Sequence, residues 1–182
     1  FSITIEDEKA LTGLPESALT AAKELATAKE QQGFTFTLDI PSYLPVMMYC
    51  DNADLRKQLY TAFVTRASDQ GPNANEFDNS AIMDELLSLR HELANLLDFD
   101  NYAQHSLATK MANTTGEVME FLENLAIKSQ HQGKQDFKEL SDFAASEFKQ
   151  DNLQAWDLAY YSEKLKQSRY AISDEQLRPY FP

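Results

Sequence analysis

Apolar residues recur along positions 80–97 at alternating steps of four and three, which is the clearest pattern in the chain. The apolar positions are Ile82, Leu86, Leu89, Leu93 and Leu96 or Leu97. On a helix this spacing forms one continuous stripe, so the pattern predicts an amphipathic helix that packs its apolar face against a partner. Polar residues, among them His91 and Glu92, occupy the other faces. We therefore expect this helix to be an organising element of the core.

Two short segments near the N-terminus alternate apolar and polar residues instead. They are Phe1–Ile5 and Phe34–Ile40, and the period of two predicts β-strands. Pro15 and Gly33 bracket the residues between them, which predicts an intervening polar helix. The two strands are expected to pair as a small ladder. Residues 41–50 are apolar but follow Ile40-Pro41 and contain Leu44-Pro45, so we expect a structured connection there and not an uninterrupted helix.

Capping signals and apolar spacing predict further helices along the remaining chain. The candidate caps are Asp51, Thr114 in a Thr-x-x-Glu capping box, Asp157, and Ser173 in a Ser-x-x-Gln box. A shorter helix is expected within 101–112, and Gly133 is expected to divide residues 114–148 into a helical hairpin. The predicted fold class is mainly α, a helical bundle or array with a small two-stranded β element (Phe1–Ile5 with Phe34–Ile40). Residues 1–182 contain no linker and form one segment.

Composition excludes several classes of partner. The 182 residues carry a formal net charge of −13, which repels nucleic acid and anionic membranes alike. No apolar run approaches the roughly 20 residues of a membrane span. The single cysteine, Cys50, cannot form an internal disulfide and is interpreted as a small core residue in a cytoplasmic protein.

The histidines do not form a metal-binding motif. A peptidase zinc site needs H-E-x-x-H on one helix, but Asn95 stands where the second histidine after His91-Glu92 would be. His105 and His131 are isolated and lack the Glu-x-x-His spacing of di-iron bundles. We therefore expect His91 to be an exposed polar residue. No catalytic, cofactor-binding or metal-binding residue is predicted in this chain.

Two other features have both structural and functional interpretations. The first is an aromatic group that could line a peptide groove or belong to the core and its edge: Trp156, Tyr160, Tyr161 and Tyr170. Because aromatic side chains bury large areas wherever they occur, the core interpretation is favoured. The second is Asn113-Thr114-Thr115, which matches a glycosylation sequon. A helix cap explains these residues better.

Several stretches together resemble the thimet oligopeptidase family of zinc metallopeptidases. They are LDIPSYLPVMMYC (38–50), TRASDQGPNA (65–74), LRHELANLL (89–97), SLATKMA (106–112), WDLAYYSEKLKQ (156–167) and SDEQLRPYFP (173–182). The resemblance implies a cytoplasmic, mostly helical peptidase that uses zinc to cleave short peptides inside a deep channel. It also places the zinc signature HEFGH and a further Glu ligand C-terminal to the YFP stretch, with which this chain ends.

These implications define the expected role of the chain. It starts on Phe1 and stops at Pro182, so we expect an internal segment of a larger neurolysin-like peptidase domain that lacks the catalytic zinc region. Such a segment would form part of the channel wall, be inactive alone and bind no zinc. Its exposed apolar faces could drive self-association. The alternative is a stand-alone, non-catalytic helical module that binds peptides or a protein partner.

Overall fold

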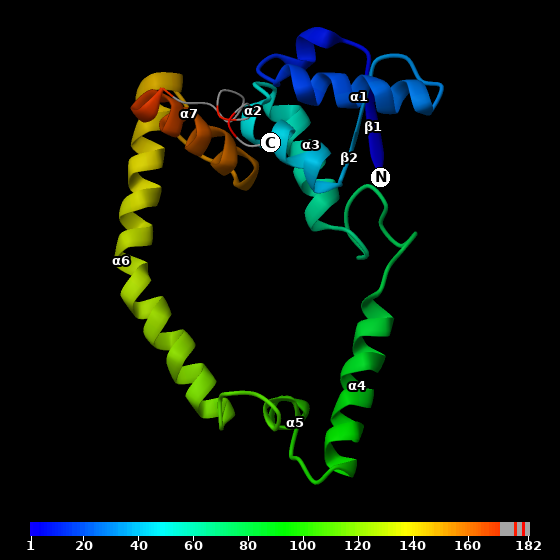
Figure 1. Ribbon diagram of the computed structural model, residues 1–182, viewed down its shortest axis with the longest axis vertical. Coiled ribbons are helices and arrows are strands. Elements are labelled where there is room, and N and C mark those ends of the chain that lie inside the picture. The colour runs from blue at the N-terminus through cyan, green and yellow to red at the C-terminus, as the bar shows by residue number, and fades with distance from the viewer. Residues whose placement is uncertain (172–176, 178–179, 181–182) are drawn as a thin grey trace.

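The computed structural model describes residues 1–171, 177 and 180, and helices dominate it (Figure 1). Its elements are β1 (Ser2–Ile5), the 3₁₀ helix η1 (Glu8–Leu11), α1 (Glu16–Ala28), β2 (Phe34–Thr37), α2 (Ile40–Tyr49), α3 (Ala53–Val64), α4 (Ser80–Leu96), α5 (Tyr102–Leu107), α6 (Thr115–Phe148), the 3₁₀ helix η2 (Ala155–Asp157) and α7 (Leu158–Tyr170). The predicted fold class is confirmed. In the part of the chain described, no helix is both long and apolar enough to cross a membrane.

The predicted β element is present, with one boundary corrected. β1 and β2 pair antiparallel, with Ser2 opposite Thr37 and Ile5 opposite Phe34. The second strand ends at Thr37 and does not reach Ile40. The backbone carbonyl of Asp39 already accepts hydrogen bonds from the N–H groups of the third and fourth residues after it, so a helix begins there.

The prediction that two prolines prevent a helix in residues 41–50 was wrong, because α2 occupies Ile40–Tyr49. Pro41 lies in the first turn, where a backbone N–H would have no partner within the helix, so the proline removes no helical hydrogen bond there. Pro45 does remove one helical hydrogen bond. Burial of Tyr43, Val46 and Met47 in the core offsets that loss. Tertiary packing therefore overrides the local signal.

We call residues 1–64 and 137–171 the body. Its main core lies between the sheet, α1, α2 and α3, and buries Leu11, Phe36, Val46, Cys50 and Leu59 almost completely. α7 packs on α2, and η2 packs on α3, so the C-terminal part of the described chain returns to the N-terminal part (Figure 1). A second cluster joins the end of α6 to α7 through Leu140, Ala144, Tyr160 and Tyr161.

We call residues 65–136 the arm. A loop leads from α3 to α4, which runs away from the body, and α6 returns to it on the other side of Figure 1. At the far end α4 contacts α5, and α5 contacts α6. The predicted helix over residues 80–97 is confirmed. Its expected burial is wrong for the chain as described, because Leu89 is 57% exposed and Leu96 is 74% exposed.

The hairpin predicted around Gly133 is also wrong, because α6 is one helix of 34 residues that passes through this glycine. An internal glycine costs a helix only about 1 kcal/mol relative to alanine. The capping box at its start is confirmed in modified form. Thr114 Oγ1 accepts from the Glu117 N–H at 3.1 Å, while the Glu117 carboxylate accepts from the Asn113 N–H at 2.8 Å. The sequon residues thus serve as a helix cap.

Two residues predicted to cap helices have other roles. Asn52, and not Asp51, caps α3 by accepting from the N–H groups of Asp54 and Leu55. Asp157 stands at the start of α7 but its side chain makes no cap hydrogen bond to that helix. The Ser173 capping box lies outside the described residues. The side chains of Asp51 and Asp157 instead connect the N-terminal part of the body, residues 1–64, with η2 and α7.

Candidate functional site

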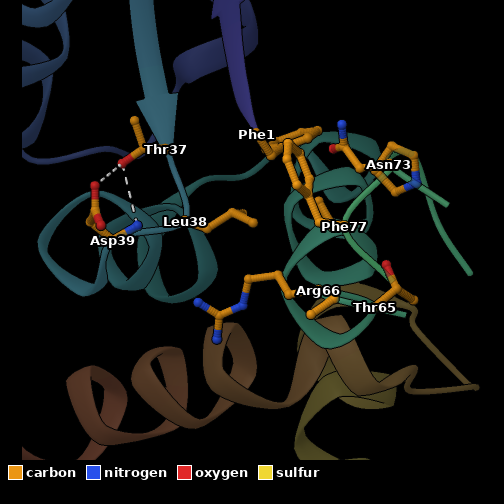
Figure 2. A pocket seen from close by; sticks show the side chains of 11 residues that line it. Phe1, Thr37, Leu38, Asp39, Thr65, Arg66, Asn73 and Phe77 are labelled. Carbon is orange, nitrogen blue, oxygen red and sulfur yellow. Dashed lines mark hydrogen bonds between the residues drawn. The ribbon is translucent and has the colours of Figure 1, made fainter. Parts of the chain in front are cut away.

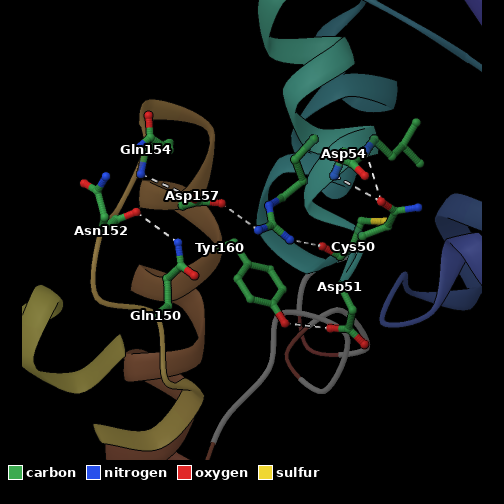
Figure 3. Close-up of polar contacts among 11 residues, drawn as sticks. Cys50, Asp51, Asp54, Gln150, Asn152, Gln154, Asp157 and Tyr160 are labelled. Atoms are coloured by element: carbon green, nitrogen blue, oxygen red, sulfur yellow. Dashed lines mark hydrogen bonds and ion pairs between the residues drawn. The ribbon is translucent and has the colours of Figure 1, made fainter. Parts of the chain in front are cut away.

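A buried ion pair connects α3 with the turn before α7 (Figure 3). Arg56 and Asp157 have side chains only 2% and 4% exposed, and Arg56 Nη2 donates to Asp157 Oδ1 at 2.7 Å. Arg56 Nη1 donates to the Cys50 carbonyl oxygen at 2.6 Å. Asp157 Oδ2 accepts from the Gln154 N–H at 3.1 Å. Both charges are therefore compensated, although the residues are 101 positions apart in the sequence.

A second hydrogen bond lies beside the ion pair. Tyr160 donates from its hydroxyl to Asp51 Oδ1 at 2.7 Å, and Lys164 Nζ lies 3.5 Å from the same oxygen. The guanidinium carbon of Arg56 is 4.1 Å from the centroid of the Tyr160 ring. Burial raises the pKa of the Tyr160 phenol, and the hydrogen bond to Asp51 raises it further. Tyr160 therefore stays a neutral donor and is unsuited to act as a base or nucleophile.

We call Arg56, Asp157, Tyr160 and Asp51 the polar clamp. Its members bind one another, although Arg56 Nε is buried and has no hydrogen-bond partner among the described residues. The clamp joins the two parts of the chain that precede and follow the arm. Sequence reasoning missed it. The available signal was a single arginine next to the apolar positions Leu55 and Leu59 of α3, but nothing local identifies a partner 101 residues away. The arrangement holds elements together and offers no group for chemistry.

A cavity of about 400 Å³ lies where β2 and α3 meet the loop that leads into the arm. Figure 2 shows Phe1 and Phe77 close together on one wall, with Thr37 and Asp39 across from them. Thr37 Oγ1 donates to Asp39 Oδ2 at 2.8 Å. Arg66 Nε donates to the Phe63 carbonyl, and its guanidinium carbon is 4.0 Å from the Phe63 ring centroid. The cavity combines apolar walls with one cation, Arg66, and one carboxylate, Asp39, which accepts the hydrogen bond of the Thr37 hydroxyl.

The structure places the three histidines on three different helices. His91 is exposed on α4, as predicted, and His131 is exposed on α6. His105 on α5 is half-buried between the rings of Phe99 and Tyr102, with centroids at 5.4 and 5.5 Å. Within residues 1–171, 177 and 180, no three His, Cys, Asp or Glu side chains gather in a way that could hold a metal ion.

The remaining candidates are mostly structural. Cys50 is fully buried, as predicted, and burial raises the pKa of its thiol. Tyr160 and Tyr161 are buried, and Trp156 packs on the edge of the main core, 6.1 Å from Tyr60 between ring centroids. Tyr170 is 65% exposed. The core interpretation therefore holds for three of the four aromatic residues and not for Tyr170.

Comparison with known proteins identifies the class. Residues 46–182 match Peptidase family M3, and the chain belongs to this family. It is 61% identical to oligopeptidase A of Salmonella typhimurium and 61% identical to oligopeptidase A of Escherichia coli, each over 98% of the chain. It is 42% identical over its whole length to a probable cytosolic oligopeptidase A of Arabidopsis thaliana. The chain spans 26% of the length of each of these relatives. The resemblance inferred from the sequence motifs is confirmed.

Proposed function

We propose that this chain is an internal segment of a cytoplasmic zinc metallo-oligopeptidase, a hydrolase that cleaves short peptides. The observation that carries the proposal is 61% identity to oligopeptidase A over nearly the whole chain. Coverage of about a quarter of these relatives supports the view that the catalytic region lies elsewhere in a longer protein. The single reduced and buried cysteine is consistent with the cytoplasm.

The residues of this chain do not fit a catalytic zinc. His91 is followed one helical turn later by Asn95, and the other histidines lie on different helices. A metal-bound water is the nucleophile in zinc peptidases, and zinc lowers the pKa of that water enough to ionise it near neutral pH. A chain without the ligands cannot hold such a water. We therefore assign no step of hydrolysis to residues 1–182, and we propose that they bind no zinc and are inactive alone.

The proposed role of the segment is to build part of a helical wall around the substrate channel. The arm supports this, because α4 and α6 extend far from the main core of the body and α5 contacts both of them at their far end (Figure 1). Long helices that project in this way can form a wall together with other parts of a protein. The rival, a stand-alone binding module, is favoured by one observation, the exposed leucine face of α4.

The complete gene product provides the test. We expect its reading frame to contain H-E-x-x-H after Pro182, and the purified product to bind one zinc and cleave short peptides in a chelator-sensitive way. Residues 1–182 expressed alone should do neither. A reading frame without that motif would refute the peptidase proposal and leave the binding module. Stoichiometric zinc with chelator-sensitive cleavage by residues 1–182 would show that the segment contains a site of its own.

A further inference from the structure

The apolar stripe of α4 is fully formed and has no partner in the described chain. Ile82, Leu86, Leu89, Leu93 and Leu96 are between 40% and 74% exposed. Ala94 is the only buried residue of this helix. A monomeric soluble protein rarely leaves a contiguous apolar surface of this kind uncovered, so the stripe indicates an interface.

The spacing of the stripe suits a helical partner. Steps of four and three residues give an average period of 3.5, which is the repeat of helices that pack side by side at a crossing angle of about 20°. Helices that pack on a sheet, as α1 does on β2, have a similar spacing. A helix with an apolar stripe of its own fits the full length of this face.

The charges beside the stripe restrict the partner further. Glu85 and Glu92 are seven residues apart, so they lie on the same edge of the stripe, and both are exposed. No described residue forms an ion pair or hydrogen bond with either carboxylate. A helix with lysine or arginine facing this edge would complement it. A second copy of this acidic chain, with its net charge of −13, is a poor candidate.

The first part of α6 also has an exposed apolar surface, whereas the middle part does not. Met119, Phe121, Leu122, Leu125 and Ile127 are each about half exposed or more. The next stretch, residues 128–136, is polar on every face and exposed. A helix that is polar all round is expected to remain in contact with water. Within the arm, the apolar surface of α6 is thus confined to the part of this helix that is remote from the body.

We propose that the apolar face of α4 is an internal interface of the complete peptidase, covered by a helix with basic residues along one edge from a part of the protein outside residues 1–182. This inference rests on the proposed function, since the relatives are about four times as long as the chain. The polar section of α6 stays solvent-exposed in the same protein.

Cysteine labelling tests the interface with a matched pair of variants. Leu89 lies at the centre of the stripe and His91, two residues on, lies on the opposite face, and both are exposed in this chain. The variants Leu89→Cys and His91→Cys are made in the complete gene product and in residues 1–182, and a maleimide is followed by peptide mass spectrometry at each site. Cys50 is buried and should stay unlabelled in the folded chain.

In residues 1–182 the two variants should be labelled at similar rates. In the complete protein we expect labelling of Leu89→Cys to slow at least tenfold, while His91→Cys changes by less than threefold. Equal labelling of Leu89→Cys in both proteins would overturn the proposal. A second result would also overturn it. If Leu89→Cys is protected in residues 1–182 alone, and the protection increases with protein concentration and accompanies a dimer in light scattering, the stripe is covered by a second copy of the chain.

A charge reversal tests whether the partner helix has basic residues along the edge that faces Glu85 and Glu92. In the complete protein, adding Glu92→Lys to the Leu89→Cys variant should speed its labelling several-fold, whereas Asp84→Lys, on the far face of α4, should not. An unchanged rate with Glu92→Lys would refute the basic edge. The labelling result and the zinc measurement are independent: protection of Leu89→Cys in a complete protein that lacks H-E-x-x-H would refute the peptidase and leave the interface.

Discussion

Replacing Asp157 by alanine tests whether the polar clamp holds the body together. Among the described residues, the Asp157 carboxylate is the only anion paired with Arg56, and both side chains are almost fully buried. The variant leaves a guanidinium in the interior with the Cys50 carbonyl and the Tyr160 ring as its remaining contacts. Removing one partner of a buried ion pair typically costs about 3–5 kcal/mol. At roughly 2–4 °C per kcal/mol for a chain of this size, the midpoint of unfolding should fall by about 6–20 °C.

The chain contains its own probe for this measurement, because its single tryptophan, Trp156, is adjacent to Asp157. Fluorescence during urea or thermal unfolding therefore reports the clamp region directly. Asp142→Ala is the matched control, since Asp142 pairs with Lys138 on the surface of α6, where the side chains are 65% and 75% exposed. Exposed pairs of this kind contribute only about 0.3–0.5 kcal/mol.

A double variant distinguishes an unpaired charge from a simple loss of packing. Arg56→Met combined with Asp157→Leu removes both charges and should be more stable than either single variant, because no ion is left buried without a partner. The reasoning is refuted if Asp157→Ala unfolds within about 0.5 kcal/mol of the wild type. It is also refuted if the double variant is no more stable than the more stable of the two single variants.

Four further outcomes follow from single residues. Burial and the hydrogen bond to Asp51 raise the pKa of Tyr160, so its contribution to stability is complete below the usual tyrosine pKa of about 10 and is lost as pH rises above it. Tyr160→Phe should therefore flatten the alkaline loss of thermal stability. Gly13 has φ +92°, and a Cβ there would lie 2.2 Å from the Tyr49 carbonyl oxygen, so Gly13→Ala should destabilise the body by more than about 1 kcal/mol in urea unfolding. Gly133→Ala, with no atom within 4 Å of the added Cβ, should instead stabilise α6 by about 0.5–1 kcal/mol and increase helicity by circular dichroism. The buried Cys50 thiol, whose pKa is raised by burial, should react with a thiol reagent only at the rate at which the body unfolds.

Local signals predicted the features of this fold that depend on neighbouring residues. The stripe over residues 80–97, the capping function of Thr114 and the strand alternation at both ends of α1 all involve contacts within a few positions along the chain. In these features, the residues that give the sequence signal are also the residues that make the stabilising contacts. The helix at Ile40–Tyr49 was missed because its stability comes from burial of side chains against α3 and α7, which outweighs the cost of Pro45.

The candidate site was harder to predict than the fold for a related reason. Periodicity shows that the leucine face of α4 needs a partner, but not whether that partner lies in the same stretch of sequence. Likewise, Asp51 and Asp157 have the residue type and position of helix caps, and only the folded chain shows that their carboxylates bind Tyr160 and Arg56 instead. An aspartate can accept hydrogen bonds from either a helix N-terminus or a distant side chain. Sequence spacing does not distinguish these uses.

The clamp and the arm are mechanically related. α6 has 34 residues, so it is about 50 Å long, and a rotation of about 5° at its base moves its far end by about 4 Å. Its base is fixed to α7, where the Phe148 and Tyr161 rings meet at 5.4 Å, and α7 follows directly after Asp157. A rotation of this size at the base would displace α5 and the attached end of α4 by about three quarters of the height of a helical turn. Such a displacement is enough to move a leucine stripe out of register with a helical partner. The buried ion pair, with its fixed distances and directions, holds the start of α7 on α3, and the cluster of Leu140, Ala144, Tyr160 and Tyr161 transmits that position to the base of α6.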